Sequence, residues 1–341
     1  MKRFLSILLL PVFAVMAGSA YAIEAIPEEA GWSGFLRLGA GGLKAETNMV
    51  SGIDRYGIDI GNDKIDSLDS SPDSETVPIP QANLNVAYTF STQTQLFLGN
   101  SLEDVVQLDL VSIFGVRQQF SDKSILEFST VTSPAAGPIQ VWKDPYVVGE
   151  DREETDRSSF GLRLEYDRIL GTGFGLQYTQ RETEIDDEQS GTTQLGLSSA
   201  EAALLDREGD TRRIVVNYRF KPVGRNVYSL RVGRSDIDLD GEAMAGDSNS
   251  IQLTHVHLGD RYITALSGAI GTTEYDASNP VFGKTRDDDS LGLAFFVFDK
   301  GLFDNKDWWG QASIAWFEQD SNIDFYVQSS LAIILGVQRN F

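Results

Sequence analysis

Segments with the two-residue alternation of β-strands recur along almost the whole chain of 341 residues. We count about fourteen, each about nine to eleven residues long, which is the length that a tilted strand needs to cross a bilayer. An even number of strands brings both ends of the chain to the periplasmic side, as single-chain bacterial barrels require. The pattern predicts an all-β fold, a transmembrane antiparallel up-and-down β-barrel. The strands are expected to start near Trp32, Gln81, Gln95, Val106, Ile125, Phe160, Phe174, Arg213, Val227, Ile251, Tyr262, Leu291, Trp308 and Phe325.

Alternation alone also fits a soluble β-sandwich, which would bury the apolar face and leave the arginines in water. The connections favour the barrel, because they alternate between long and short as outer loops and periplasmic turns do. The long connections span 44–80, 133–158 and 182–211, and the short ones span 91–94, 121–124, 167–173 and 221–226. Modest outer loops are expected near 100–105 and 318–323. The apolar residues of each strand should then face lipid and the polar residues should face the lumen.

Aromatic residues gather at one level of the predicted strands. They fall at the ends of descending strands and at the starts of ascending ones, which predicts a single ring at a membrane interface. Its members are Tyr88, Phe90, Phe120, Tyr166, Phe174, Tyr218, Phe220, Tyr228, Tyr262, Phe296, Phe298, Trp308, Trp309 and Phe341.

The amino terminus carries the features of a secretory signal peptide. Lys2 and Arg3 precede an apolar run over 4–16, and residues 20–22 form a small-x-small cleavage site. The run is shorter than the roughly 20 residues that a spanning helix requires. We therefore expect a signal peptide at 1–22 and a single barrel domain at 23–341, located in the outer membrane.

The carboxyl terminus ends on Phe341, after a strand with one apolar face. This ending resembles the signal by which the barrel assembly machinery of the outer membrane recognises its clients. The position two residues earlier, which is usually aromatic, is Arg339. The ending indicates that the assembly machinery is a partner of this chain.

The chain has a formal net charge of −22 and no cysteine. Without disulfides, an exported protein must be stabilised by a continuous hydrogen-bonded framework or by a large core. An acidic surface repels nucleic acid. Acids concentrate in the outer loops 46–75 and 182–210, where they would enrich cations and bridge through divalent ions to the phosphates of lipopolysaccharide, unless they merely solvate the loops.

Three stretches carry a more specific resemblance, at residues 65–75, 279–288 and 320–326. They are similar to a family of uncharacterised outer-membrane barrel proteins from Gram-negative marine bacteria. The similarity extends through most of the chain after the signal. It implies the fold and the location, and it supplies no functional residues.

Charged residues on the predicted lumen face are the main candidates for a functional site. Guanidinium groups facing carboxylates would create a transverse field that sorts small polar solutes, as in a channel or porin. A salt-bridged interior that only braces the wall is the alternative. The candidates are Arg37, Asp109, Arg117, Glu127, Arg163, Glu165, Arg181, Arg213, Arg219 and Arg231.

A folded-in loop is the expected obstruction of such a lumen. The best candidate is 182–211, where Ser198 and Glu201 match a capping box and predict a short helix. That helix would either enter the lumen or sit on the outer rim.

One acidic cluster has the spacing of a calcium loop. Asp236, Asp238, Asp240 and Asp247 occupy positions 1, 3, 5 and 12 of the pattern. In a calcium loop the last ligand is normally Glu, and the element before the loop is normally a helix. The alternative is a strand that runs past the bilayer and carries these residues on its outer face.

Enzymatic chemistry is not expected. His255 and His257 are the only histidines, they share a strand face, and no spacing joins them to a nucleophile or an Asp pair. The sequence favours a channel for small polar solutes. The alternative is a non-conducting surface barrel whose acidic loops bind divalent cations, lipopolysaccharide or another partner.

Overall fold

A computed structural model describes residues 25–53, 57–104, 109–133 and 138–341. The predicted signal peptide and the expected strand start at Val106 lie outside these residues. The strands and the one α-helix are β1 Gly31–Glu46, β2 Val50–Ile53, β3 Ile58–Asp59, β4 Ser74–Thr89, β5 Thr94–Asp104, β6 Asp109–Gln119, β7 Ile125–Thr132, β8 Ile139–Trp142, β9 Glu154–Asp167, β10 Phe174–Ile185, α1 Ser199–Ala203, β11 Gly209–Arg219, β12 Asn226–Leu239, β13 Gly246–Leu258, β14 Tyr262–Asn279, β15 Lys284–Lys300, β16 Trp308–Ser321 and β17 Gln328–Asn340. None of the helices in these ranges is long and apolar enough to cross a membrane.

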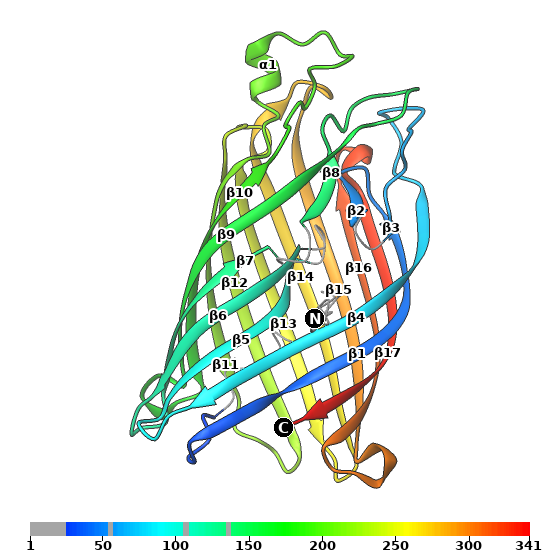
Figure 1. The fold of residues 1–341 in the computed structure, drawn as a ribbon. Helices are drawn as coiled ribbons and strands as arrows, with labels where there is room; N and C mark the ends of the chain where they lie inside the picture. Colours follow the sequence, from blue (N-terminus) through cyan, green and yellow to red (C-terminus); the bar gives the residue numbers. More distant parts are fainter. Residues whose placement is uncertain (1–24, 54–56, 105–108, 134–137) are drawn as a thin grey trace, which may run out of the picture.

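The long strands form a closed antiparallel barrel of 14 strands (Figure 1), as predicted. Each strand pairs with its neighbours in chain order, and the three short strands β2, β3 and β8 stand outside this cycle. The barrel closes between β1 and β17, where the register runs from Phe35 opposite Asn340 to Glu46 opposite Ser329. Closure leaves no sheet edge along this seam, as a lipid environment requires.

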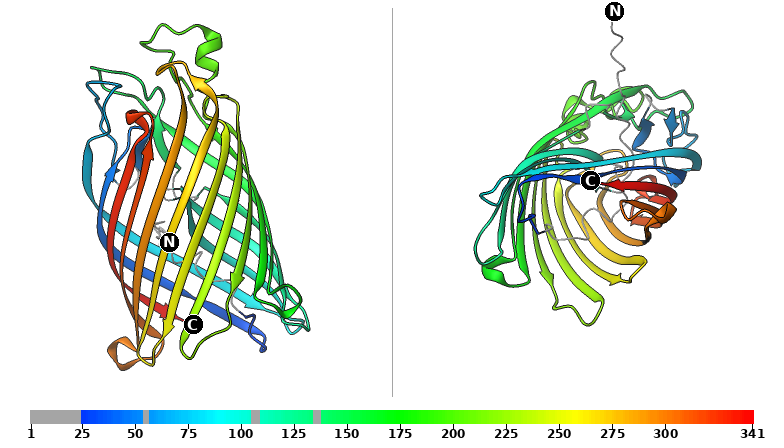
Figure 2. Two further views of the ribbon diagram at one scale, coloured as in Figure 1. Left: turned by 180° about the vertical axis from the view of Figure 1, so that it is seen from behind. Right: turned by 60° about the horizontal axis from the view of Figure 1, so that its bottom comes forward.

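The descending strands begin earlier than the alternation predicted. β4 starts at Ser74, β9 at Glu154 and β15 at Lys284, several residues before the expected starts. Their extra residues lie at the outer end, where the strands extend the barrel wall (Figure 2). The final strand, in contrast, begins later than predicted. A 3₁₀ turn covers Asp324–Tyr326, and β17 begins only at Gln328.

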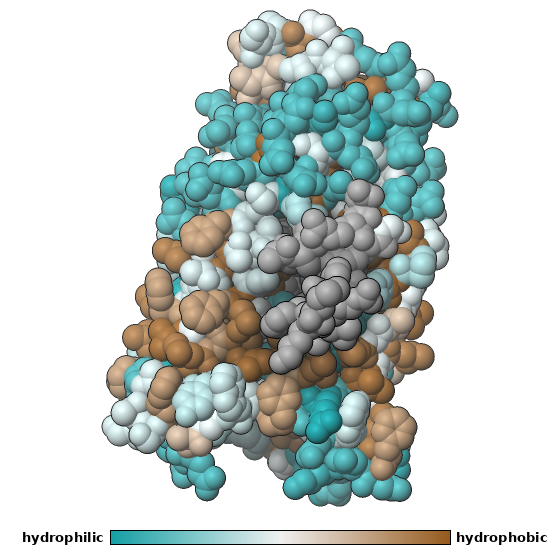
Figure 3. All heavy atoms as spheres, viewed as in Figure 1, coloured by the Kyte–Doolittle hydropathy of each residue, from teal (hydrophilic) through white to brown (hydrophobic). Residues whose placement is uncertain are grey.

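The apolar side chains of the barrel strands face outward. Alternate residues along single strands are exposed, as with Leu162 at 44% and Leu164 at 47% on β9, while Arg163 between them is 7% exposed. Figure 3 shows the resulting band of apolar side chains around the lower half of the visible face, with polar residues above it. The predicted orientation, with apolar residues toward lipid and polar residues inward, is confirmed.

The aromatic ring is partly confirmed. Phe90, Phe120 and Phe174 are exposed at the level of the short turns. Phe296 and Phe298 were assigned to the ring wrongly, because their side chains are 2% and 6% exposed and pack in the largest interior apolar cluster. The outward residue of that stretch is Phe295, so the assignment erred by one position of the alternation.

The obstruction of the lumen comes from a different place than predicted. β2 and β3 belong to the first outer connection, and their residues Val50, Ile53 and Ile58 are buried against the inner wall formed by β1, β4 and β17. β2 also pairs with β8, which in turn continues along the outer part of β9. We call β2, β3 and β8 together the inner plug. The predicted candidate, residues 182–211, does not form it.

The outer loops pack into a second apolar core above the barrel, which we call the cap. Tyr146, Leu205, Phe325 and Tyr326 are each fully buried in it, although they come from three different connections. Helix α1 lies at the outer rim (Figure 1), with its predicted capping box formed. Of the two predicted positions of this helix, the structure therefore shows the outer rim and not the lumen.

Candidate functional site

A cavity of about 440 Å³ lies inside the barrel and is lined by residues of the strands, the inner plug and the cap. Six of its lining residues are arginines, and among the described residues that line it there is no Asp or Glu. The arginines are Arg157, Arg181, Arg207, Arg213, Arg231 and Arg286. A strongly acidic protein thus encloses a cationic chamber.

Three of these arginines lie on three consecutive strands. Each occupies an inward-facing position, and the pairing registers of the strands place the three side chains in one region of the wall. Arg181 of β10 stands opposite Thr211, and Arg213 of β11 stands opposite both Thr179 and Ser235. Arg231 of β12 stands opposite Asn217. The sequence predicted all three as lumen residues.

Neutral groups hold two of these guanidinium groups in place. Arg181 donates through Nη2 to the hydroxyl of Ser159 at 2.6 Å, and Arg231 donates through Nη2 to Oε1 of Gln177 at 3.2 Å. Such bonds fix the orientation of a guanidinium group. Both groups are thus held at the border of the cavity.

Arg213 is the least satisfied of the cavity arginines. Its Nε is buried and has no hydrogen-bond partner among the described residues. The neighbouring Gly233 is closely surrounded, since a Cβ at that position would lie 3.7 Å from Nη2 of Arg213 and only 2.8 Å from the hydroxyl of Ser250. A buried donor without an acceptor is costly, so this place suits an anionic acceptor.

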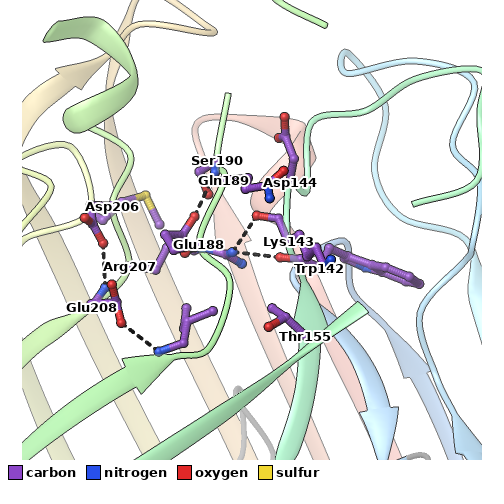
Figure 4. Close-up of polar contacts among 12 residues, drawn as sticks. Trp142, Lys143, Asp144, Thr155, Glu188, Gln189, Ser190, Asp206, Arg207 and Glu208 are labelled. Atoms are coloured by element: carbon purple, nitrogen blue, oxygen red, sulfur yellow. Dashed lines mark hydrogen bonds and ion pairs between the residues drawn. The ribbon is translucent and has the colours of Figure 1, made fainter. Parts of the chain in front are cut away.

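Arg207 reaches the cavity from the connection between β10 and β11. It donates through Nε to Glu188 at 2.6 Å and through Nη2 to the carbonyl oxygens of Trp142 at 2.7 Å and Lys143 at 3.2 Å (Figure 4). Both partners of the ion pair are buried, at 7% and 9% side-chain exposure. Arg207 therefore ties this connection to β8 of the inner plug.

Lys143 reinforces the same junction at the surface. Its ammonium group lies 3.0 Å from Glu153 and 2.8 Å from Asp187. The hydrogen bond from Lys143 holds the pKa of the Asp187 carboxyl below its ordinary value. The connections 133–153 and 186–208 are thus linked by charges as well as by Arg207.

Arg286 is neutralised within the wall. Its Nη2 lies 2.7 Å from Asp288, and its guanidinium group stacks over the rings of Tyr275 at 4.6 Å and Tyr326 at 3.9 Å. This residue braces the boundary between the barrel and the cap. It contributes less net charge to the chamber than the arginines of β10–β12.

Four predicted arginines lie elsewhere. Arg37 bonds Gln338 at 2.6 Å and lies over Phe298 on the inner apolar wall. Arg163 donates to Thr179 at 3.1 Å. The other two are Arg117, which is paired with a carboxylate of the neighbouring strand, and Arg219, which ends β11 at the periplasmic side. These residues face inward, and none of them lines the cavity.

The predicted carboxylates do not face the cavity arginines across the lumen. Glu127 pairs with Arg117 at 2.7 Å, and these two residues are direct neighbours in the register of β6 and β7. Glu165 stands opposite Glu127 and Gln177 on adjacent strands. The side chain of Asp109 lies outside the described part of the chain. Glu127 is thus paired along the wall, and neither Glu127 nor Glu165 lines the cavity.

The aspartates with calcium-loop spacing do not converge. Asp236 and Asp238 lie on β12 and are more than half exposed, and both approach Arg212, at 3.8 and 3.3 Å. Asp247 lies on β13 and pairs with Arg234 at 2.9 Å. No group of three metal-ligating side chains is formed within the described ranges. Asp236, Asp238 and Asp247 belong to a strand pair and Asp240 only follows it, so the structure does not gather them into one loop, and calcium binding stays a prediction.

The two histidines share one partner. His255 Nε2 and His257 Nδ1 each lie 3.0 Å from Oδ1 of Asn226, and His255 also stacks on Tyr228 at 4.7 Å. All four residues lie near the periplasmic ends of β12 and β13. This arrangement satisfies the imidazoles as wall residues.

Sequence reasoning missed three of the cavity arginines. Arg157 and Arg286 keep the inward parity of β9 and β15, but they lie beyond the strand starts that the apolar alternation marked. Extending each strand outward until its loop begins would have found them. Arg207 belongs to an irregular connection, and no periodic signal marks such a residue.

One family model and several solved structures match this chain. The family model described as "Protein of unknown function (DUF2860)" matches residues 31–340. Among solved structures, a loop L8 deletion mutant of OmpT, an outer membrane protein of Vibrio cholerae, is 12% identical, with 92% of this chain and 99% of that chain covered and a TM-score of 0.41. The CymD monoaromatic hydrocarbon channel is 9% identical, with coverages of 91% and 88% and a TM-score of 0.49.

A search of curated protein sequences gave no match. The membership of an uncharacterised protein family that the motifs at 65–75, 279–288 and 320–326 indicated is confirmed. The protein belongs to the DUF2860 family.

Proposed function

We propose that the protein is a channel that passes small polar solutes across the outer membrane through the arginine-lined cavity. The observation that carries the proposal is the cavity of about 440 Å³ inside a closed barrel. A barrel wall that only needed bracing would fill its interior with paired charges and apolar side chains. Here six guanidinium groups border open space, and charged side chains line the selective part of many channels.

The size of the cavity supports small solutes. Binding sites for small molecules have volumes of about 300–1,000 Å³. The inner plug and the cap border the same space, since Val50, Val141 and Met244 are among its lining residues. Passage of a solute would therefore require these elements to move, and the resting conductance should be low.

Planar-bilayer recording of the purified protein tests the channel. Insertion is verified first by the shift between folded and heat-denatured bands on a gel. We expect discrete conductance steps that become larger when the Arg207→Ala variant loosens the junction between loop and plug. Silent membranes that contain verified inserted protein, for the wild type and for the variant, would refute the channel.

A second candidate function follows from the cap. Its buried aromatic core closes over the outer end of the barrel, which also suits a non-conducting surface barrel with acidic loops for divalent cations, lipopolysaccharide or another partner. That function predicts loss of membrane integrity in a deletion strain and no change in solute uptake. Normal integrity together with slower uptake would favour the channel instead.

A further inference from the structure

We propose that the cavity is a binding site for a small organic anion with an apolar body, such as an aromatic carboxylate or phosphate. The inference rests on the proposed channel, because it names the class of solute that this channel would take. Three features of the cavity carry it: its charge, an unsatisfied donor and apolar lining residues.

The charge of the cavity wall selects anions. Arg181, Arg213 and Arg231 project from adjacent strands, and Arg157 of β9 lies beside them. Charges enclosed by a barrel wall and surrounding lipid are poorly screened, so several guanidinium groups raise the local concentration of anions and exclude cations. Because no described lining residue is acidic, an incoming anion meets no like charge in the cavity.

The unsatisfied donor locates the anionic end of the ligand. Nε of Arg213 has no acceptor among the described residues, and Ser250, which lines the same cavity, brings its hydroxyl close to the neighbouring Gly233. Thr179 and Ser235 stand opposite Arg213 in the register and also line the cavity. A guanidinium group flanked by hydroxyl donors matches the two oxygens of a carboxylate or phosphate.

The apolar residues that line the cavity explain the apolar body. Met49, Val50 and Val141 reach the cavity from the region of the inner plug, Met244 reaches it from the cap, and Phe317 reaches it from β16. An inorganic ion would leave these surfaces without a partner. An aromatic or aliphatic group attached to the anion would bury them, and burial of apolar area is favourable.

Arg213 has a matched control one residue away. Arg212 projects to the other face of β11, where it is 42% exposed and pairs with Asp236 and Asp238. Arg212→Gln and Arg213→Gln therefore make the same chemical change on the same strand. Only Arg213→Gln alters the cavity.

Calorimetric titration of the full barrel in detergent tests the site, with folding of each variant verified on a gel. The probes are benzoate, phenyl phosphate, inorganic phosphate, benzyl alcohol and benzylamine. We expect one site for benzoate or phenyl phosphate, and affinities weaker by about tenfold or more for the alcohol, the amine and inorganic phosphate. Arg213→Gln should weaken the preferred anion by about tenfold or more, and Arg212→Gln should not change it.

The two aromatic anions tell carboxylate from phosphate chemistry. Equal binding of benzyl alcohol, equal affinities of the two variants, or no binding of either aromatic anion would overturn the site. Conductance without binding would leave the channel standing and refute this inference. Binding without conductance would refute the channel and leave the binding site standing.

Discussion

Tyr146 and Tyr326 join their hydroxyl groups at 2.5 Å in the centre of the cap, although 180 residues separate them. Nδ2 of Asn279 donates to the same Tyr326 hydroxyl at 2.7 Å. Two outer connections and the outer end of β14 are thus tied together at one buried point. A group of loops held by such a network behaves as a closed cover, and its stability decides whether the outer end of the barrel is accessible.

The cap should loosen at alkaline pH. Burial raises the pKa of Tyr146 and of Tyr326. Free tyrosine titrates near pH 10, so above that pH the opened loops release protons that the closed cap retains, and closure becomes less favourable as the pH rises. Cleavage of the outer loops by subtilisin should accelerate above pH about 10. The double variant Tyr146→Phe/Tyr326→Phe should lose most of this pH dependence, and an unchanged dependence would contradict the assignment.

Removing Arg207 should release the connection between β10 and β11. Arg207→Ala leaves Glu188 buried without its cation, and breaking a buried pair costs about 3–5 kcal/mol. Arg212→Ala removes only an exposed pair and should cost less than about 1 kcal/mol. Hydrogen exchange of residues 186–208 should rise in the first variant and stay unchanged in the second. Equal protection in both would mean that Arg207 does not hold the loop.

Arg152 should hold the inner plug in place. Its guanidinium group donates to the carbonyl oxygens of Asn48 at 3.0 Å and Pro145 at 3.3 Å, and it lies over the ring of Trp142 at 4.2 Å. Arg152→Met keeps an unbranched side chain, removes the guanidinium group and so breaks the three-way link. We expect a larger unit conductance in planar bilayers than for the wild type.

A matched control for Arg152 is the exposed Arg225 in a periplasmic turn, which pairs with Asp260 at 2.7 Å. Arg225→Met should conduct like the wild type. Arg152→Met with wild-type conductance would show that the plug is held by other contacts.

Phe341 should matter for assembly more than for stability. Its backbone bonds with Gly34 persist in Phe341→Ala, and its side chain is 53% exposed. If the assembly machinery reads this ending, the variant should accumulate less folded barrel in the outer membrane. Phe174→Ala removes an equally exposed aromatic, at 51%, and serves as the control. Similar folded yields of the two variants would argue against recognition of the terminal Phe.

The fold was predictable because lipid imposes a simple rule on every strand. Alternation marks which residues face hydrocarbon, and it located the membrane-level part of all fourteen barrel strands that the structure contains. Beyond the bilayer the rule no longer applies, since Arg157 and Arg286 lie on strand extensions that water surrounds on one side. An apolar pattern therefore does not predict these extensions.

The interior was less predictable, for two physical reasons. An inward position accepts polar and apolar residues alike, so Phe296 and Phe298 look like belt residues until their parity is known. The inner plug is held by contacts between distant connections, such as Val50 opposite Val141, and no local signal in the sequence records them. Arg181, Arg213 and Arg231 were predicted because they lie at the membrane level, where the alternation of apolar and polar residues shows which side chains face inward.

Cysteine accessibility on β13 tests the central claim most directly, because the natural chain contains no cysteine. Ser250 lines the cavity, and the adjacent Ile251 is 47% exposed on the outer face. In outer-membrane fragments a small anionic methanethiosulfonate reagent should modify Ser250→Cys, and it should modify Ile251→Cys only after denaturation. The opposite pattern, with Ile251→Cys reactive and Ser250→Cys protected, would show that the barrel has no accessible arginine-lined interior and no lipid-facing apolar wall.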